Sequence, residues 1–407
     1  MFVSYRQRDG RQAATQLAWT LRAMGIPVWH DVTDLPPGDT VRVIREALAG
    51  GLSGAVVIVT DDIKNSPVVK KVEWPLIRTL NRQGDFTLGV LNAVKDSPND
   101  VYRVPDRLLR RSSDRLLGRY RHHLSGLKQY RVADGHDETD KLAADMLRQR
   151  LHHLREEIHT REHVDIDLAT RAEPSAEYAD AADLTFRWNR GEGRDPSRAA
   201  REQLHTTLHL ASSALREHTT KPLRFRGQTH LSFGLAIGAS LTLGPIVQFV
   251  SEDGLWQVTR LGNPTEPPLT NNTTDASGGH GPVLIFLDLV GPASDAAYDD
   301  LARSRQWSER LHVRLQVPGA RIAADEGDRL AHELAHTIRA ASGRNANSEV
   351  HLLLRTPLPV AILLGTLLNT VTVTVYEWSR GGNEVPAGYI PLFQVQPGEH
   401  NTITAAY

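Results

Sequence analysis

The segment His332-Glu333-Leu334-Ala335-His336 has the spacing of a helical zinc site. Two histidines four residues apart lie on one face of a helix, and in zinc proteases with this pattern the glutamate is the general base. A third ligand is needed, but Arg339 stands where one large class has glycine, and the nearest downstream acid, Glu349, precedes a predicted strand. Alanines and leucines of the predicted helix 328–342 would cover a sheet. We therefore expect no metal, and a zinc peptidase remains a minor alternative.

Near the N-terminus, Glu73, Arg6, Tyr5 and Trp29 could act on a ribosyl compound. When a good leaving group departs from ribose, an oxocarbenium-like centre remains, and an ionised carboxylate beside it stabilises that charge. Arg6 follows an apolar run and could pair with a pyrophosphate, while the two aromatic rings could stack on a base. The structural alternative is that Glu73 forms an exposed ion pair with Lys70 and that Arg6 is a solvated charge at a strand end.

A second set of residues is suited to an anionic ligand with several rings. A cyclic oligonucleotide requires cations, backbone amides at helix N-termini and flat side chains for stacking. Arg224 and Arg226 alternate onto one face of a predicted strand, and Tyr376 and Trp378 share a face of another. Aromatic residues in strands more often belong to the core or to an edge, and this alternative stays open. The candidate set is Lys221, Arg224, Arg226, Gln228, Thr229, His230, Arg355, Thr356, Tyr376 and Trp378.

These residues need elements that position them, and residues 1–158 alternate between strand and helix patterns. Such an alternation predicts a parallel sheet covered by helices. A helical pattern from Lys141 to Ile158 would close this domain. Residues 159–179 are polar, with alternating charges and a break at Glu173-Pro174-Ser175, and are predicted to be an interdomain linker. The predicted strands of the first domain are Phe2–Tyr5, Pro27–Trp29, Ala55–Val59 and Thr87–Val94.

Residues 180–407 contain an internal repeat. A strand, a turn, a helix with a central glycine and a second strand occur twice, with Leu223 matching Val350 (350 − 223, a period of 127 residues) and Gly238 matching Gly365. Two β-α-β halves predict a doubled Rossmann-like fold with a shared cleft at the carboxyl ends of its strands. Chance similarity between two common units is the alternative.

The composition narrows the function classes. The chain has 407 residues, 40% hydrophobic and 23% charged, which predicts two folded domains. It has no cysteine, which excludes disulfides, thiolate metal sites and a cysteine nucleophile. The formal net charge of −1 gives no reason to expect DNA or anionic lipid as a partner, and we expect no leader and no membrane span. For the basic stretch Arg103–Arg131 a solvated face is expected, with a nucleic acid or subunit contact as the alternative.

Residues 1–158 resemble a Toll/interleukin-1 receptor (TIR) domain. The resemblance rests on Phe2-Val3-Ser4-Tyr5-Arg6, Val28-Trp29-His30-Asp31, Leu35-Pro36-Pro37-Gly38-Asp39 and Gly54-Ala55-Val56-Val57-Ile58-Val59-Thr60, in that order. Enzymatically active members cleave NAD at the nicotinamide–ribose bond. The resemblance gives the catalytic role to Glu73, which ends the segment starting at Ser66. It implies NAD contacts by Tyr5, Arg6, Trp29, Asp34, Leu35 and Ser66; the loop holding Asp34 and Leu35 contacts a neighbour in TIR assemblies.

The chain departs from the TIR pattern beside Glu73. Val69 stands where the family has an aromatic residue four positions before the glutamate, and Pro75 follows soon after it. A TIR domain that only recruits partners is the alternative from another class, because a fold does not fix a function.

Residues 180–407 resemble a SAVED domain, a fused pair of CARF-like units from anti-phage proteins that respond to cyclic oligonucleotides. The resemblance rests on residues 226–238, on 354–357 through 365, and on Val375-Tyr376-Glu377-Trp378. Together the two resemblances imply a cytoplasmic NAD hydrolase of antiviral defence, activated by cyclic tri-adenylate or, second, cyclic tetra-adenylate. The ligand would assemble chains into oligomers or filaments in which TIR domains complete one another's sites. No prosthetic group is expected.

Overall fold

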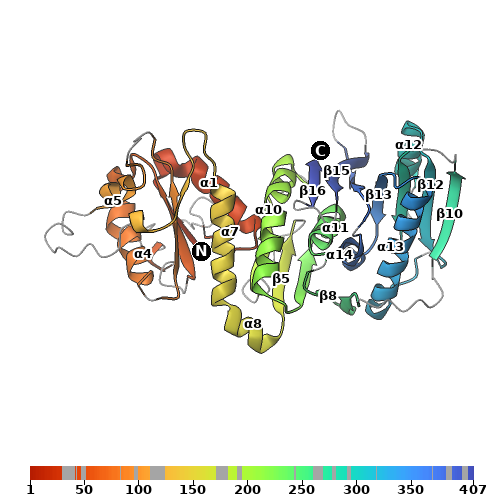
Figure 1. The fold of residues 1–407 in the computed structure, drawn as a ribbon, viewed down its shortest axis with the longest axis horizontal. Coiled ribbons are helices and arrows are strands. Elements are labelled where there is room, and N and C mark those ends of the chain that lie inside the picture. The colour runs from red at the N-terminus through yellow and green to blue at the C-terminus, as the bar shows by residue number, and fades with distance from the viewer. Residues whose placement is uncertain are drawn as a thin grey trace. The chain divides into compact units, whose positions relative to one another are not determined.

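The chain forms two compact units, Met1–Glu156 and Glu157–Tyr407, shown in a computed structural model (Figure 1). No helix in the described part of the chain has both the length and the apolar character needed to span a membrane. The structure describes residues 1–29, 42, 44–46, 52–82, 84–95, 100–110, 124–170, 182–189, 195–242, 244–259, 269–276, 281–290, 295–317, 319–368, 370–381, 387–396 and 402–407.

The first unit is built on a parallel sheet in the order β1-β2-β3-β4. A parallel bridge from Phe2 to Trp29 places a further extended segment on the other side of β1, so the order reverses at β1 as in a flavodoxin-like sheet. The prediction of a parallel sheet is confirmed, since buried parallel strands are continuous apolar runs. The strands are β1 (Phe2–Ser4), β2 (Gly54–Val59), β3 (Thr87–Asn92) and β4 (Gln129–Arg131).

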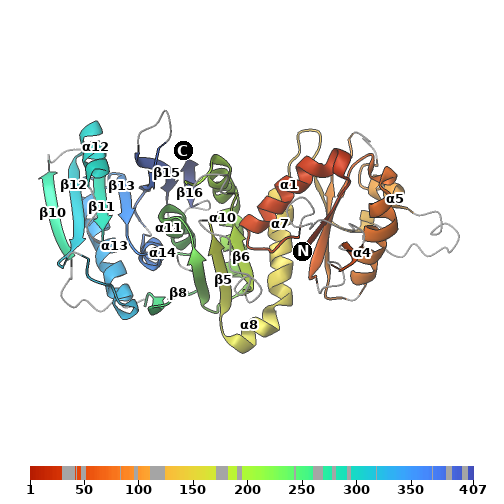
Figure 2. The ribbon, with the colours of Figure 1, turned by 180° about the vertical axis from the view of Figure 1, so that it is seen from behind.

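Helices cover both faces of this sheet (Figure 2). In α1 (Gln7–Ala23), the apolar positions Ala14, Leu17, Ala18 and Leu21 form one buried stripe with helical spacing. The other helices are α4 (Trp74–Leu80), α5 (Val104–Leu109) and α7 (Thr139–His153). Alternate residues of the strands pack against α4 and α5 on one face, while α1 and α7 contact the sheet from the other.

The predicted linker is wrong over its described residues. Helix α8 (Arg155–Arg161) leads directly into β5 (Val164–Ala169), an interior strand of the next sheet, paired with β6 and β7. Asp165 and Asp167 alternate with Val164, Ile166 and Leu168 along β5, so the strand is apolar on one face only. Because charged residues alternate with apolar ones along β5, the sequence pattern favoured a polar linker over a strand.

The second unit contains two sheets with the same arrangement of parallel strands. The first has the order β6-β5-β7-β8-β9, and the second contains β12-β11-β13-β14-β15 between the outer strands β10 and β16. In both, four parallel strands are followed by an antiparallel one. The strands are β6 (Leu184–Arg187), β7 (Leu223–Gln228), β8 (Val247–Ser251), β9 (Gly254–Gln257), β10 (Leu269–Ala276), β11 (Val283–Asp288), β12 (Glu309–Leu315), β13 (Val350–Arg355), β14 (Val373–Ser379), β15 (Gly388–Val395) and β16 (Ile403–Ala406).

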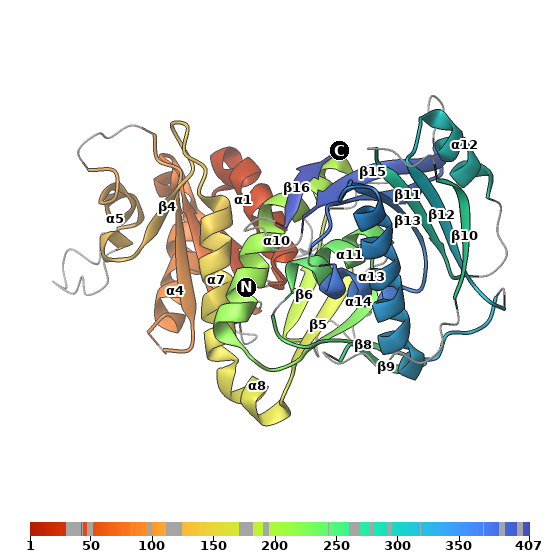
Figure 3. The same ribbon diagram turned by 45° about the vertical axis from the view of Figure 1, so that its right-hand side comes forward.

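The doubled Rossmann-like fold and its repeat are therefore confirmed. Helix α11 (Leu231–Ser240) follows β7, and α14 (Leu358–Leu367) follows β13, at the predicted spacing of 127 residues (358 − 231). The other helices are α10 (Arg198–His218), α12 (Ala296–Ser304) and α13 (Gly327–Arg344). Figure 3 shows α11 and α14 side by side between the two sheets.

Helices α11 and α14 touch through their backbones. A Cβ atom at Gly238 would lie 2.0 Å from the carbonyl oxygen of Ile362, and one at Gly365 would lie 2.3 Å from that of Leu235. Gly234, one turn earlier in α11, lies against Leu358 and Ile362 at the start of α14. The contacts thus run in the same direction along both helices, which are parallel and begin at the same end of the pair.

We predict that Gly238→Ala destabilises the second unit by about 1–3 kcal/mol or more, because the added methyl group overlaps a backbone carbonyl that cannot move freely. Gly343→Ala is the matched control: this glycine lies near the end of α13 and its Cβ position is open. That substitution should leave stability unchanged or raise it by up to about 1 kcal/mol. Calorimetric unfolding of both variants tests this prediction. Equal unfolding temperatures for Gly238→Ala and Gly343→Ala would contradict the close contact between α11 and α14.

Candidate functional site

The carboxylate of Glu73 is buried at the carboxyl end of β1. Its side chain accepts a hydrogen bond from Ser4, with Ser4 Oγ 2.5 Å from Glu73 Oε2. Glu73 is 6% exposed and Ser4 is 1% exposed. The end of β1 is also where the strand order of the sheet reverses, the position at which open α/β sheets bind ligands. The alternative of an exposed Glu73–Lys70 ion pair does not fit a buried carboxylate.

The turn that carries Glu73 is wider than an α-helix. Residues Val69–Glu73 form a π-helix closed by the bond from the Trp74 N–H to the Val69 carbonyl, and α4 begins directly after it. Pro75 lies in the first turn of α4, where its missing N–H is tolerated. Val69, which replaces the family's aromatic residue, is buried in the core against Trp74. Single π turns inside helices are frequent at functional sites.

Two of the other predicted NAD contacts, Arg6 and Ser66, lie close to Glu73 in the fold or in its sequence segment. Arg6 donates to the carbonyl oxygen of Asp62 at 3.0 Å and pairs with its carboxylate, so it lies at the same sheet edge as Glu73. Ser66 caps the turn that leads to Glu73, since its Oγ accepts a bond from the Val69 N–H at 3.3 Å.

The remaining predicted contacts are structural or lie outside the described residues. Tyr5 is buried beside Arg6. The Trp29 ring is partly buried and stacks on Phe2 with centroids 5.3 Å apart, so one face of the ring packs against the core. The predicted contacts Asp34 and Leu35 lie outside the described residues.

In the second unit, the N-termini of α11 and α14 lie side by side at the carboxyl ends of β7 and β13. Each helix begins three residues after its strand ends, and the two helices are parallel, so the N–H groups of their first turns face the same region. Helix N-termini attract anions. This edge is therefore the place in the second unit that is best suited to phosphate groups.

Only part of the predicted ligand set lies at this edge. Gln228 is exposed at the end of β7. Thr229 and His230 are buried beneath it, where Thr170 Oγ1 lies 2.8 Å from Thr229 Oγ1 and 2.9 Å from His230 Nδ1. Thr356, the repeat equivalent of Thr229, is buried at the end of β13.

An internal carboxylate occupies the N-terminus of α11. Glu377 of β14 accepts hydrogen bonds from Ser232 N at 3.1 Å and from Ser232 Oγ at 2.8 Å. Glu377 is buried and belongs to the second repeat, whereas Ser232 belongs to the first. The first turn of α11 thus already holds an anion that joins the two halves.

In the second half, carboxylates already engage Arg355. Its Nε lies 2.6 Å from Asp288 Oδ1 and its Nη2 lies 2.9 Å from Asp295 Oδ1. Arg314 contacts the same two carboxylates. Burial alone would raise the pKa of Asp288, but hydrogen bonds from Arg355 and His312 hold it below its usual value. A phosphate would have to compete with these carboxylates for Arg355.

The same cluster has the spacing of a metal site, with ligand atoms of Asp288, Asp295 and His312 within 4.8 Å of one another. Two guanidinium groups balance the two carboxylates, so the cluster has no excess negative charge to attract a cation. Burial lowers the pKa of His312, which therefore adds no positive charge near neutral pH. The donor set does not call for a metal ion.

Two of the other predicted ligand residues, Lys221 and Arg224, lie at the start of β7, away from the helix N-termini. The ammonium group of Lys221, which precedes the strand, lies 3.4 Å from Glu162, and Arg224 lies 3.1 Å from His163 Nε2. Arg226 is nearer the carboxyl end of β7, two residues before Gln228, and is paired in register with the buried Asp167 of β5. The two arginines alternate along β7 and so share one of its faces.

The two aromatic residues of β14 have different surroundings. Tyr376 belongs to the core cluster that includes Phe286 and Trp307, and its hydroxyl lies 3.0 Å from His351 Nδ1. Trp378, two residues further along the same face, is 44% exposed. The core alternative therefore applies to Tyr376, while Trp378 is free to stack on a ligand.

The His-Glu-x-x-His segment lies on α13. His332 Nε2 is 3.0 Å from the carbonyl oxygen of Thr259, and His336 is exposed. Glu333 lies between them with its carboxylate buried, and burial raises its pKa. The opposite face of the helix packs into the core through Leu330, Leu334 and Ile338. These contacts are those of a helix covering a sheet.

The basic stretch Arg103–Arg131 has structural contacts in its described parts. Arg107 pairs with Asp100 at 3.0 Å, and the buried Arg131 donates to the carbonyl oxygen of Val94 at 2.9 Å. Residues 111–123 lie outside the described part of the chain.

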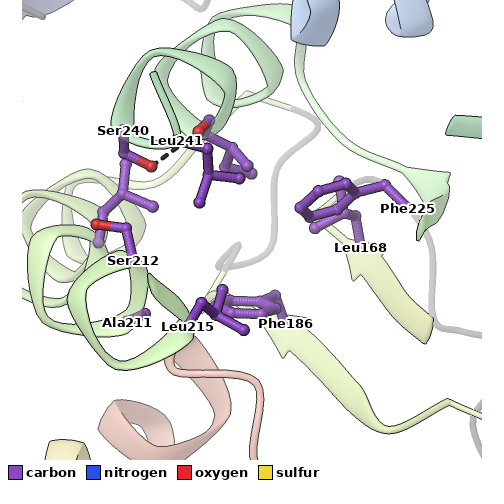
Figure 4. Close-up of a pocket in the computed structure, with 10 residues that line it drawn as sticks. Leu168, Phe186, Ala211, Ser212, Leu215, Phe225, Ser240 and Leu241 are labelled. Atoms are coloured by element: carbon purple, nitrogen blue, oxygen red, sulfur yellow. Dashed lines mark hydrogen bonds between the residues drawn. The ribbon is translucent and has the colours of Figure 1, made fainter. Parts of the chain in front are cut away.

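A small apolar pocket lies between α10, α11 and the first sheet of the second unit (Figure 4). It is closed by side chains such as Phe186, Leu215 and Phe225, and Ser240 and Leu241 place it near the end of α11. Its lining has no charged group, so it is a gap in the core and does not suit a phosphate ligand.

Sequence reasoning missed Ser4, Glu377 and the Asp288–Asp295 pair. Ser4 and Asp288 are each the last residue of a buried parallel strand. A polar residue in that position is the signal that could have found them, because carboxyl ends of parallel strands form ligand sites. Glu377 gave no such signal, since its partner lies 145 residues away.

Two family models match the chain. One, for the TIR domain, matches residues 1–103; the other matches residues 205–395 and describes the SAVED domain, the SMODS-associated sensor domain fused to various effectors. No curated protein matches.

Similar solved structures include two Cap4 SAVED/CARF-domain containing receptors. That of Acinetobacter baumannii, with the cyclic trinucleotide 2'3'3'-cAAA, has 11% identity and a TM-score of 0.47, covering 87% of this chain and 97% of that chain. That of Moraxella osloensis has 13% identity and a TM-score of 0.41, with coverage of 88% and 85%.

We predict that Asp288→Asn lowers the free energy of unfolding of the second unit by about 3 kcal/mol at pH 7, because it leaves two guanidinium groups without their shared carboxylate. The pKa of Asp288 in the folded chain lies below the ordinary 3.8, so its contribution is present above that value and is lost as the pH falls through the folded pKa. The difference between variant and wild type should therefore shrink below about pH 4.

Urea denaturation at several pH values is the measurement. The control is Asp300→Asn on α12, an exposed carboxylate paired with Arg303, which should change stability by less than about 0.5 kcal/mol. A loss at Asp288 no larger than at Asp300 would show that the cluster contributes nothing.

Proposed function

Because the chain joins a TIR domain to a SAVED sensor domain, we propose that it is an NAD hydrolase activated by a cyclic oligonucleotide. The observation that carries the proposal is the buried carboxylate of Glu73, held by Ser4 at the sheet edge where the strand order reverses. A carboxylate fixed there, in a unit with the TIR pattern, is suited to face a ribosyl centre.

In the proposed reaction the bond between nicotinamide and the ribose anomeric carbon breaks, and nicotinamide leaves with the bonding electrons. The ionised carboxylate of Glu73 stabilises the resulting oxocarbenium-like centre. Water then adds to the anomeric carbon and loses a proton, which gives ADP-ribose. Arg6, at the same edge, pairs with the pyrophosphate in exchange for the Asp62 carboxylate.

Self-association is part of the proposal. Only 6% of the surface of Glu73 is exposed, so a ribose could reach little of it in the conformation seen here. We propose that ligand binding to the SAVED domain assembles chains into oligomers or filaments, and that contacts between neighbouring TIR domains open and complete the site. Asp34 and Leu35 belong to the segment proposed to make that contact.

The proposed activator is cyclic tri-adenylate, with cyclic tetra-adenylate as the second candidate. The N-terminus of α14 offers backbone N–H groups to its phosphates, and it lies beside that of α11, where Glu377 already binds the Ser232 N–H. Gln228 and Trp378 are exposed polar and stacking groups of β7 and β14. Arg355 can join once a phosphate replaces one of its carboxylate partners.

We expect Glu73→Gln to reduce nicotinamide release at least about a hundredfold, because it removes the charge that faces the developing cation but keeps the size of the side chain. Glu46→Gln, an exposed glutamate paired with Arg42, is the control and should keep normal turnover. The assay incubates each protein with NAD alone and with each member of a panel of cyclic oligonucleotides. If ligand binds and chains assemble but NAD stays intact, the domain is a recruiting scaffold.

Trp378→Ala should raise the ligand concentration needed for half-maximal activity about fivefold to a hundredfold, because a stacking contact is worth roughly 1–3 kcal/mol. Trp378→Phe keeps an aromatic face and should lie near the wild type. Turnover at saturating ligand should be the same in all three proteins. Light scattering recorded with nicotinamide release tests this, and an unchanged half-activating concentration in Trp378→Ala would place the ligand elsewhere.

A further inference from the structure

We propose that Ser4 is a positioning residue for the carboxylate of Glu73, an inference that rests on the proposed NAD hydrolase function. Ser4 is the last residue of β1 and is paired in register with Val57 of β2. Its Oγ donates to Glu73 Oε2 at 2.5 Å, across 69 residues of sequence. Neither side chain has appreciable contact with solvent.

The element that carries Glu73 does not fix its direction well by itself. A π turn is a rare helical form, and here a proline that cannot donate a backbone bond follows it one residue after Trp74. The side chain of glutamate also has a broad terminal torsion. A hydrogen bond from a rigid interior strand therefore sets the plane of the carboxylate.

The parallel sheet holds Ser4 in place. Its backbone is anchored by β2, whose side chains are buried on both faces of the sheet. Orientation by a neighbouring rigid element is what a reacting carboxylate needs, because small errors in direction weaken its stabilisation of a transition state.

A serine that only satisfies a buried carboxylate would show a different pattern of effects. Its loss would destabilise the fold and lower activity through the folded fraction. A positioning role instead lowers kcat in fully folded enzyme, leaves KM unchanged and disappears when Glu73 no longer acts. The kinetic parameters of four variants separate these roles.

The test measures kcat and KM for nicotinamide release in the full chain with saturating activator. Ser4→Ala should lower kcat about tenfold to a hundredfold, the range expected for a hydrogen bond to a charged group, while KM stays within about threefold. Ser4→Thr keeps the hydroxyl and should restore most of the rate. In the Glu73→Gln background, Ser4→Ala should have less than about a twofold further effect. Ser53→Ala, a serine before β2 that accepts a bond from Arg150, is the matched control and should be unchanged.

Thermal unfolding of each variant shows whether it is folded at the assay temperature. The positioning role is overturned, while the proposed function stands, if folded Ser4→Ala has normal kcat. It is also overturned if Ser4→Ala lowers kcat by the same factor in the wild-type and Glu73→Gln backgrounds. If Ser4→Ala is unfolded, the Ser4→Thr variant decides, since low turnover in a folded protein that retains the hydroxyl also overturns the role. No nicotinamide release by the wild type under any ligand overturns the proposed function and this inference with it.

Discussion

The backbone contact between α11 and α14 determines how the second unit is assembled. Gly238 and Gly365 occupy equivalent positions in the two repeats, and each meets the partner helix without a side chain between them. Because the helices are parallel, this crossing brings together the ends of β7 and β13 as well. The groups at that edge, from Gln228 to Arg355, are brought together by the close approach of α11 and α14, and the two glycines permit this approach because they have no side chain.

The two halves share a topology, but the polar groups at the carboxyl ends of their strands have different kinds of partners. The first half uses the hydroxyl and imidazole groups of Thr170, Thr229 and His230, and receives Glu377 from the other half. The second half uses paired charges around Asp288. Duplication thus preserved the backbone, where packing between helices and sheets sets the constraint, while the polar groups at the edge diverged.

Patterns that depend on burial could be predicted from the sequence. Strands β1, β2 and β3 of the first unit and the repeat were predicted because strands buried in parallel sheets are apolar along most of their length. Strand β4 was missed, since its sequence Gln129-Tyr130-Arg131 is mostly polar, and β5 was missed, since one of its faces is polar. For site residues, the sequence indicated a shared face but not a partner: Arg355 meets Asp288 across 67 residues and Tyr376 meets His351 across 25. Such pairings depend on the tertiary fold, which residue spacing alone does not contain.

The chemical difference between the halves has a consequence for a ring of identical nucleotides. Such a ring has rotational symmetry when its linkages are identical too, whereas the edge formed by β7, β13 and the two helices has none, because its two halves present different groups. At the proposed site, a ring of three units with identical bases and linkages would have three equivalent rotations, which would favour binding by RT ln 3, about 0.6 kcal/mol. A ring of mixed bases or mixed linkages would have no such degeneracy, and its rotations would be distinguishable.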